Sequence, residues 1–112
     1  MTHTITEENY IKSIYLLQLT VDKVSTSLLS AEINTKPASV TDMLKKLRAK
    51  RIVHYQRYKG FSLTEAGNKK ALSIIRKHRL WEYFLVNKLG FGWDEVHMVA
   101  EELEHITSNE LI

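Results

Sequence analysis

Histidines and carboxylates in the C-terminal half of the chain recur at helical spacing. His78 and Glu82 are four residues apart. A second set with spacings of four, three and one follows later in the chain: His97, Glu101, Glu104 and His105. Residues three or four apart share one face of a helix. Imidazoles and carboxylates crowded into a seam between helices repel and desolvate one another unless a cation lies among them. The spacing therefore predicts a site for a divalent transition metal.

The ligand types narrow the choice of metal. The chain has no cysteine, which excludes disulfides, zinc fingers, iron–sulfur clusters and thiol catalysis. Imidazole with carboxylate suits Mn²⁺, Fe²⁺, Co²⁺ or Zn²⁺ better than Cu⁺, and the nitrogen ligands disfavour Ca²⁺ and Mg²⁺. An exposed acidic helix with incidental histidines would explain any single His–Glu pair. Two facing stripes that hold three of the five histidines favour the metal.

A basic group of residues lies in the middle of the chain. Residues 36–59 contain eight Lys or Arg and one acid, whereas residues 92–112 contain six acids and no Lys or Arg. This separation predicts a basic surface for a polyanion and an acidic region with another role. The residues expected to contact DNA are Lys36, Ala38, Ser39, Thr41, Asp42, Lys45, Lys46, Arg57, Tyr58 and Lys59.

These residues differ in what they are expected to reach. The first residues of a recognition helix approach base edges in the major groove, where Ala38 can meet a thymine methyl group and Asp42 can accept from cytosine. Lys45 and Lys46 lie further along and are expected to contact phosphates. The run 57–59 is expected to form the tip of a wing over the backbone or minor groove. A solvated basic face without DNA binding is the alternative.

Hydrophobic periodicity predicts the elements that position both groups. Helices are expected over residues 6–20, 27–33, 37–50, 64–88 and 94–106, with Thr6 and Thr64 as N-caps and Pro37 at a first helical position. Residues 52–63 change period and predict a hairpin turning at Lys59 and Gly60. Three helices followed by a hairpin are typical of a winged helix-turn-helix. The apolar candidates for the interhelix core and a dimer are Trp81, Phe84, Leu85, Phe91 and Trp93.

Composition excludes several classes of protein. The 112 residues are 44% hydrophobic and 26% charged, which is ordinary for a globular domain. No apolar run is long enough to span a membrane, and the N-terminus has no secretory signal, so a cytoplasmic location is expected. The H-E-x-x-H pattern of zinc hydrolases is absent. We therefore expect neither an enzyme nor a small organic substrate.

Five segments, in order, run through essentially the whole chain: EENYIKSIYLL, KPASVTDMLKKL, YKGFSLTEAG, RKHRLWEYFL and EELEH. Together they resemble the diphtheria toxin repressor family, especially its manganese transport regulators. The resemblance implies a homodimeric, metal-activated repressor that binds palindromic operators of metal-uptake genes. It also implies a mainly α fold, with a winged helix-turn-helix and two-stranded wing in residues 1–63. A helical metal-binding and dimerisation region would occupy residues 64–112, truncated at its C-terminal end.

The resemblance implies two groups of metal ligands. Glu101, Glu104 and His105 match the primary site, which in the family takes a further ligand from the position of Asn9. The residues that match the second site of iron-type members are His78, Glu82 and His97.

Three positions bear on the metal. Asn9 stands where the family usually has Met or Asp, and Lys12 stands where manganese-type members have a second carboxylate. Glu101 replaces the cysteine of iron-type members, which moves the site towards harder metals. The mixed pattern predicts Mn²⁺ or Fe²⁺, with Mn²⁺ favoured and Zn²⁺ or Co²⁺ as substitutes in vitro. Two alternatives remain open: a winged-helix regulator that does not respond to metal, and a protein-interaction module without DNA binding.

Overall fold

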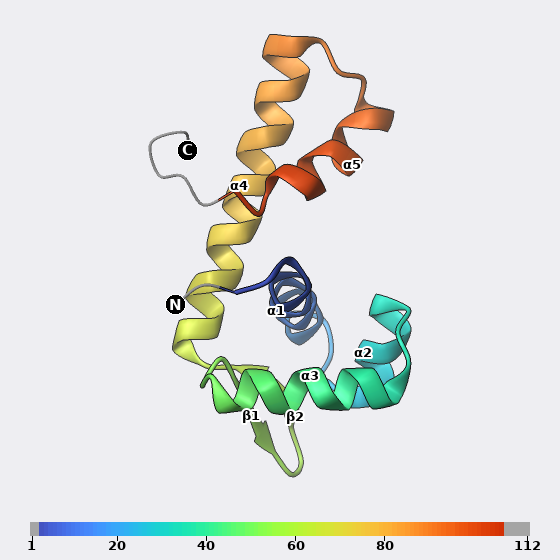
Figure 1. Cartoon of the computed structure of the whole chain (residues 1–112), viewed down its shortest axis with the longest axis vertical. Helices are drawn as coiled ribbons and strands as arrows, with labels where there is room; N and C mark the ends of the chain where they lie inside the picture. The colour runs from blue at the N-terminus through green and yellow to red at the C-terminus, as the bar shows by residue number, and fades with distance from the viewer. Residues whose placement is uncertain (1–2, 107–112) are drawn as a thin grey trace. The chain divides into compact units, whose positions relative to one another are not determined.

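The computed structural model describes residues 3–106 and divides the chain into two compact units, Met1–Ala71 and Leu72–Ile112. We call them the N-terminal and C-terminal units. The elements in chain order are α1 (Ile5–Gln18), α2 (Thr26–Ile33), α3 (Pro37–Ala49), β1 (Val53–Gln56), β2 (Gly60–Leu63), α4 (Glu65–Leu89) and α5 (Trp93–Leu103) (Figure 1). The mainly helical prediction is confirmed. Across the described residues, none of these helices combines the length and apolar character needed to span a membrane.

Helix α1 begins at Ile5 because Thr4 and Glu7 cap it reciprocally. The backbone N–H of Glu7 donates to Oγ1 of Thr4 at 3.0 Å, and the N–H of Thr4 donates to Oε1 of Glu7 at 2.9 Å. This capping box satisfies two of the orphan donors at the helix start. The prediction that Thr6 is the N-cap is wrong, because only Thr4 has a glutamate three residues later.

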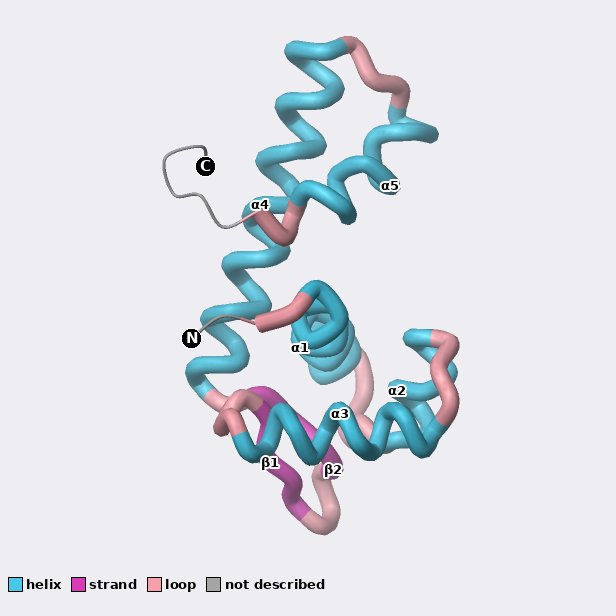
Figure 2. The backbone as a smooth tube through the Cα atoms, viewed as in Figure 1, coloured by secondary structure: helices cyan, strands magenta, loops and turns pink. Residues whose placement is uncertain are grey.

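Helices α2 and α3 form the helix-turn-helix of the N-terminal unit (Figure 2). Ser25 caps α2 by accepting from the N–H of Leu28 at 3.1 Å. Asn34 ends α2 with φ +57°, a left-handed conformation that asparagine tolerates better than most residues. Pro37 then occupies the first turn of α3, where its missing N–H costs no hydrogen bond.

Strands β1 and β2 form the predicted antiparallel hairpin. Val53 pairs with Leu63 and Gln56 with Gly60. The N–H of Phe61 also donates to the carbonyl of Val24 at 2.9 Å, which ties the hairpin to the segment before α2. Gly60 has φ +72°, and a Cβ there would lie 2.4 Å from the Val24 oxygen. Glycine is therefore required at this turn by conformation and by space.

One apolar core holds the N-terminal unit together. Its buried side chains come from α1, α2, α3 and the hairpin, and include Ile11, Ile14, Leu29, Val40, Leu44, Leu47, Val53 and Leu63. Burial of a side chain of this size contributes about 1.5–3 kcal/mol. The predicted stripe of α3 is confirmed, because Val40, Leu44 and Leu47 are buried and Met43 packs half-buried against the core. The other residues of α3 are exposed.

Two ion pairs of the N-terminal unit each join a buried glutamate to a half-buried lysine. Nζ of Lys50 lies 2.6 Å from Oε2 of Glu7, and Nζ of Lys70 lies 3.0 Å from Oε2 of Glu8. Burial acts to raise the pKa of Glu7. The hydrogen bonds from Lys50 and Thr4 and the charge of Lys50 outweigh it and lower that pKa to about 2. Glu7 therefore links the start of α1 to the end of α3 as a carboxylate.

In the C-terminal unit, α5 folds back along the second part of α4 (Figure 1). Gly90 with φ +71° follows the end of α4, and Gly92 is the N-cap of α5. Helix α5 ends at Leu103, three residues earlier than predicted, with Glu104 as its C-cap. The prediction that Glu104 and His105 lie within the helix is therefore wrong.

The apolar candidates of the C-terminal unit divide between core and surface. Leu85 is buried with Val96 and Ala100, and Trp81 and Phe91 are half-buried. Phe84 is 42% exposed and Trp93 is 76% exposed. They therefore do not belong to the core between α4 and α5, and their part in a dimer stays a prediction.

Candidate metal centre and nucleic-acid interface

Three donor atoms of the predicted stripes meet between α4 and α5. Nε2 of His78 lies 3.2 Å from Nδ1 of His97 and 3.4 Å from Oε2 of Glu82. The third separation, from Nδ1 of His97 to Oε2 of Glu82, is 3.7 Å. Among the His, Asp and Glu side chains of residues 3–106, these three form the group whose donor atoms all lie within 4.8 Å of one another. We call it the His–Glu–His group.

The His–Glu–His group has the dimensions of a metal site. A point equidistant from three atoms with these separations lies about 2.0 Å from each, and metal–nitrogen and metal–oxygen bonds of Zn²⁺ are about 2.0–2.2 Å. His78 is buried, Glu82 is half-buried and the His97 side chain is 61% exposed. One side of the group is therefore open to solvent. These residues fit a divalent transition metal with two nitrogen ligands and one oxygen ligand.

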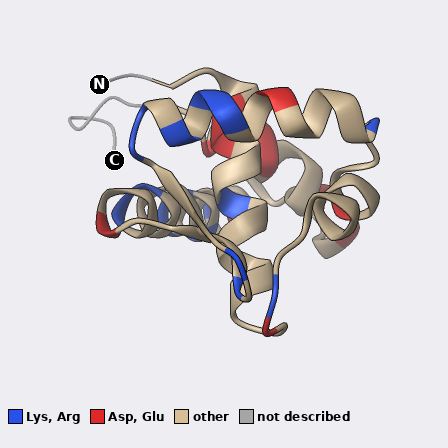
Figure 3. Cartoon of the chain, turned by 90° about the horizontal axis from the view of Figure 1, so that it is seen from below, with Lys and Arg blue, Asp and Glu red and all other residues tan. Residues whose placement is uncertain are grey.

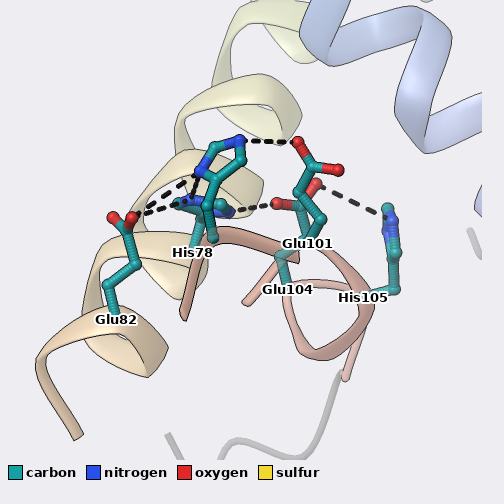
Figure 4. A network of polar contacts seen from close by, with 6 residues as sticks. His78, Glu82, Glu101, Glu104 and His105 are labelled. Carbon is teal, nitrogen blue, oxygen red and sulfur yellow. Dashed lines mark hydrogen bonds and ion pairs between the residues drawn. The ribbon is translucent and has the colours of Figure 1, made fainter. Parts of the chain in front are cut away.

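Two carboxylates predicted for the primary site, Glu101 and Glu104, contact the histidine rings of the His–Glu–His group. Oε1 of Glu104 lies 2.7 Å from Nδ1 of His78, and Oε1 of Glu101 lies 2.8 Å from Nε2 of His97. Glu82 and Glu104 thus lie on opposite sides of the His78 ring (Figure 4). Nε2 of His105 lies 3.7 Å from the other oxygen of Glu104. Glu104 and the His105 side chain are buried although both lie beyond the end of α5.

The remaining predicted ligands stay predictions. Glu101, Glu104 and His105 do not form a group as close as His78, Glu82 and His97 in the described part of the chain. Asn9 is exposed on α1, which belongs to the N-terminal unit. The structure thus brings together the ligands that the resemblance implies for the second site of iron-type members.

The predicted DNA-contacting residues all lie on the surface of the N-terminal unit. All ten, from Lys36 to Lys59, are exposed. Figure 3 shows Lys and Arg along α3 and near the turn of the hairpin, with one acidic position in α3. The buried stripe of α3 leaves Ser39, Thr41 and Asp42 facing outward near its start. This is the arrangement in which a recognition helix presents its first residues to base edges.

The wing carries aromatic residues beside the basic ones. The Arg57 guanidinium lies 5.6 Å from the centre of the Tyr58 ring, and Tyr58 is 84% exposed. Arg48 of α3 lies 6.0 Å from the Tyr55 ring on β1. Tyr55 was not among the residues expected to contact DNA, although it is 44% exposed and lies beside the hairpin turn.

Comparison with known proteins identifies the family. Residues 3–61 match the N-terminal DNA-binding domain of iron-dependent repressors, and residues 64–112 match their metal-binding and dimerisation domain. The chain belongs to the iron-dependent repressor family. Members of this family are transcriptional repressors and not enzymes, so the predictions of a winged-helix regulator and of no enzyme are confirmed.

Individual relatives match most of this chain. An uncharacterized HTH-type transcriptional regulator of Methanocaldococcus jannaschii is 37% identical over 94% of this chain and 85% of its own length. The transcriptional regulator MntR of Lysinibacillus sphaericus is 31% identical over 88% of this chain and 70% of its own length. A manganese-dependent transcriptional repressor solved with manganese has a TM-score of 0.82 and 40% identity over 94% of this chain. The chain spans 48% of that solved protein.

Proposed function

We propose that this chain binds DNA through the N-terminal unit in response to a divalent metal held by the C-terminal unit, and thereby represses genes of metal homeostasis. The observation that carries the proposal is the His–Glu–His group, whose donor atoms lie 3.2, 3.4 and 3.7 Å apart. The exposed basic face of α3 and the wing supplies the DNA-binding surface. Family membership supports the combination of the two.

Mn²⁺ is the metal we favour over Fe²⁺. The ligand set contains imidazole and carboxylate and no thiolate, and a related repressor was solved with manganese. The family description, by contrast, refers to iron. When bound, the metal supplies positive charge that removes the repulsion among His78, His97 and Glu82. The His–Glu–His group links α4 to α5, because His78 and Glu82 lie on α4 and His97 lies on α5.

The DNA partner we propose is a palindromic duplex bound by a homodimer in the cytoplasm. The helix-turn-helix provides one recognition helix in each chain, and a two-fold dimer places two such helices on half-sites about one helical turn or a multiple of it apart. The family's dimerisation domain supports this assembly. A regulator that does not respond to metal is the second candidate, and it predicts DNA binding that ignores a chelator.

Fluorescence anisotropy of a labelled palindromic duplex tests the proposal. The chain is titrated anaerobically in EDTA, then with Mn²⁺ and, separately, with Fe²⁺. We expect tight binding only with metal, with a coupling of about 1–3 kcal/mol, or roughly 5–150-fold in affinity. The metal that gives the larger shift is the one the site prefers.

Two results would contradict the proposal in different ways. Equal affinity with EDTA and with metal would leave a DNA-binding protein whose acidic region is structural. Failure to bind any duplex at low salt would remove the DNA-binding function and favour a protein-interaction module.

His78→Ala is the matched variant, because it removes one ligand from the C-terminal unit and leaves the basic face unchanged. Its binding is expected to ignore added metal.

A further inference from the structure

Both histidines of the His–Glu–His group use their two ring nitrogens for different neighbours. His78 turns Nε2 towards the group and Nδ1 towards Glu104 at 2.7 Å. His97 turns Nδ1 towards the group and Nε2 towards Glu101 at 2.8 Å. Each ring therefore lies between the three-atom group and one carboxylate outside it.

The two outer carboxylates decide which ring nitrogen carries the proton. An ionised carboxylate only accepts hydrogen bonds, and a neutral imidazole has one donor and one acceptor nitrogen. Glu82 faces the other nitrogen of each ring, but at 3.4 and 3.7 Å, whereas Glu104 and Glu101 lie at 2.7 and 2.8 Å. The shorter contacts favour the proton of His78 on Nδ1 and that of His97 on Nε2. The nitrogens left without protons are the two that face each other at 3.2 Å beside Glu82. In this state the group presents three electron-pair donors to one point.

We propose that Glu101 and Glu104 act on the His–Glu–His group as positioning residues, each fixing the tautomer and orientation of one histidine ligand. This inference rests on the proposed metal centre and deepens it. It assigns to two carboxylates, which the family resemblance implies as ligands, a separate role towards the neighbouring site. Carboxylates that accept from metal-bound histidines raise ligand basicity and hold the ring, and their loss lowers metal affinity about 10–100-fold.

Burial makes the two residues different as experimental targets. Glu104 is 1% exposed, so its substitution tests both positioning and packing. The Glu101 side chain is 53% exposed and contacts the outer edge of His97. Glu101→Gln keeps the size of the side chain and removes its charge. It is therefore the variant that separates metal affinity from folding.

The experiment is an anaerobic titration with Co²⁺ followed by its visible d–d absorption. All variants are made in a parent chain that carries His105→Ala. This substitution removes the imidazole predicted for the primary site, so that the affinity measured is that of the His–Glu–His group. In this background we expect Glu101→Gln and Glu104→Gln each to weaken Co²⁺ binding about 10–100-fold. The band shape should not change, because the three ligands are the same. Thermal unfolding without metal verifies that the variants fold.

The matched control is Glu102→Gln, which removes the same charge from a neighbouring exposed position of α5. We expect it to keep the affinity of the parent. Unchanged affinity in Glu101→Gln, or an equal loss in Glu102→Gln, would overturn the positioning role, and so would an altered d–d spectrum that makes Glu101 a ligand. A parent that binds no Co²⁺, where the wild-type chain also binds none, would instead overturn the proposed metal centre itself.

Discussion

The two units differ in surface charge and in what their buried polar side chains contact. The N-terminal unit has 12 Lys or Arg and 6 acids, and it surrounds a continuous apolar core with a basic surface. The C-terminal unit has 4 Lys or Arg and 7 acids. Between α4 and α5 it buries His78 and, just beyond α5, Glu104, while Trp93 remains 76% exposed. The buried glutamates of the N-terminal unit each pair with a lysine, whereas the buried His78 and Glu104 contact each other beside the His–Glu–His group.

This difference indicates how the functions are divided. We expect the apolar core of the N-terminal unit to keep the proposed DNA-binding surface in the same fold with and without metal. A unit with three converging donor atoms gains stability when a cation binds, by an amount that grows with the logarithm of the free metal concentration. In the proposed function, the metal therefore binds the unit that it can stabilise, and DNA binds the unit whose core needs no metal.

The largest effect we predict concerns the buried ion pair of the N-terminal unit. Glu7→Gln removes the charge paired with Lys50 and weakens the capping box at Thr4, and is expected to lower the free energy of unfolding by about 2 kcal/mol at neutral pH. Because the pKa of Glu7 falls from 4.5 to about 2 on folding, its contribution is fully present above about pH 4.5. It is lost as the pH falls towards 2. Urea denaturation of both proteins at several pH values measures this difference.

Glu65→Gln is the matched control for that prediction. Glu65 pairs with Lys69 at 3.6 Å, but both side chains are exposed, so its loss should change stability by less than about 0.5 kcal/mol. If the difference between wild type and Glu7→Gln did not narrow in acid, the buried ion pair would not support the N-terminal unit as described. Addition of Mn²⁺ should leave the difference unchanged.

A smaller effect is expected at the tip of the wing. Arg57→Ala should weaken duplex binding by up to about tenfold and make the slope of log affinity against log salt shallower by about one, because one phosphate contact is lost. Anisotropy titrations at several salt concentrations measure the slope. Lys69→Ala, which removes the same charge from an exposed position of α4, should keep it. An equal slope for Arg57→Ala and wild type would remove the wing from the DNA-binding surface.

Local rules predicted much of the fold. The apolar stripe of α3, Pro37 at its start and the hairpin turn at Gly60 follow from periodicity and backbone preference, and each has the expected place. The N-cap of α1 was misplaced by two residues because Thr4 and Thr6 are both capping types. Only the reciprocal bond with Glu7 selects between them.

The detailed metal centre could not be read from spacing. Helical periodicity placed His78 and Glu82 on one face of the fourth helix and His97 on one face of the fifth. The structure brings these three residues together. Spacing does not say which ring nitrogen faces which carboxylate, since that depends on how α5 returns along α4 to bring Glu104 beside His78, 26 positions earlier in the chain. Helical spacing also placed Glu104 and His105 inside the helix, whereas α5 ends at Leu103.

Hydrogen exchange of the whole chain, with and without Mn²⁺, tests most directly whether the metal stabilises the C-terminal unit alone. With Mn²⁺ at about 100 times its dissociation constant, amides of the C-terminal unit that exchange by unfolding of that unit should slow about 100-fold, or 2.7 kcal/mol. Core amides of the N-terminal unit, such as those of Leu44 and Leu47, should keep their rates. No change in the C-terminal unit, or an equal gain in both units, would contradict the account.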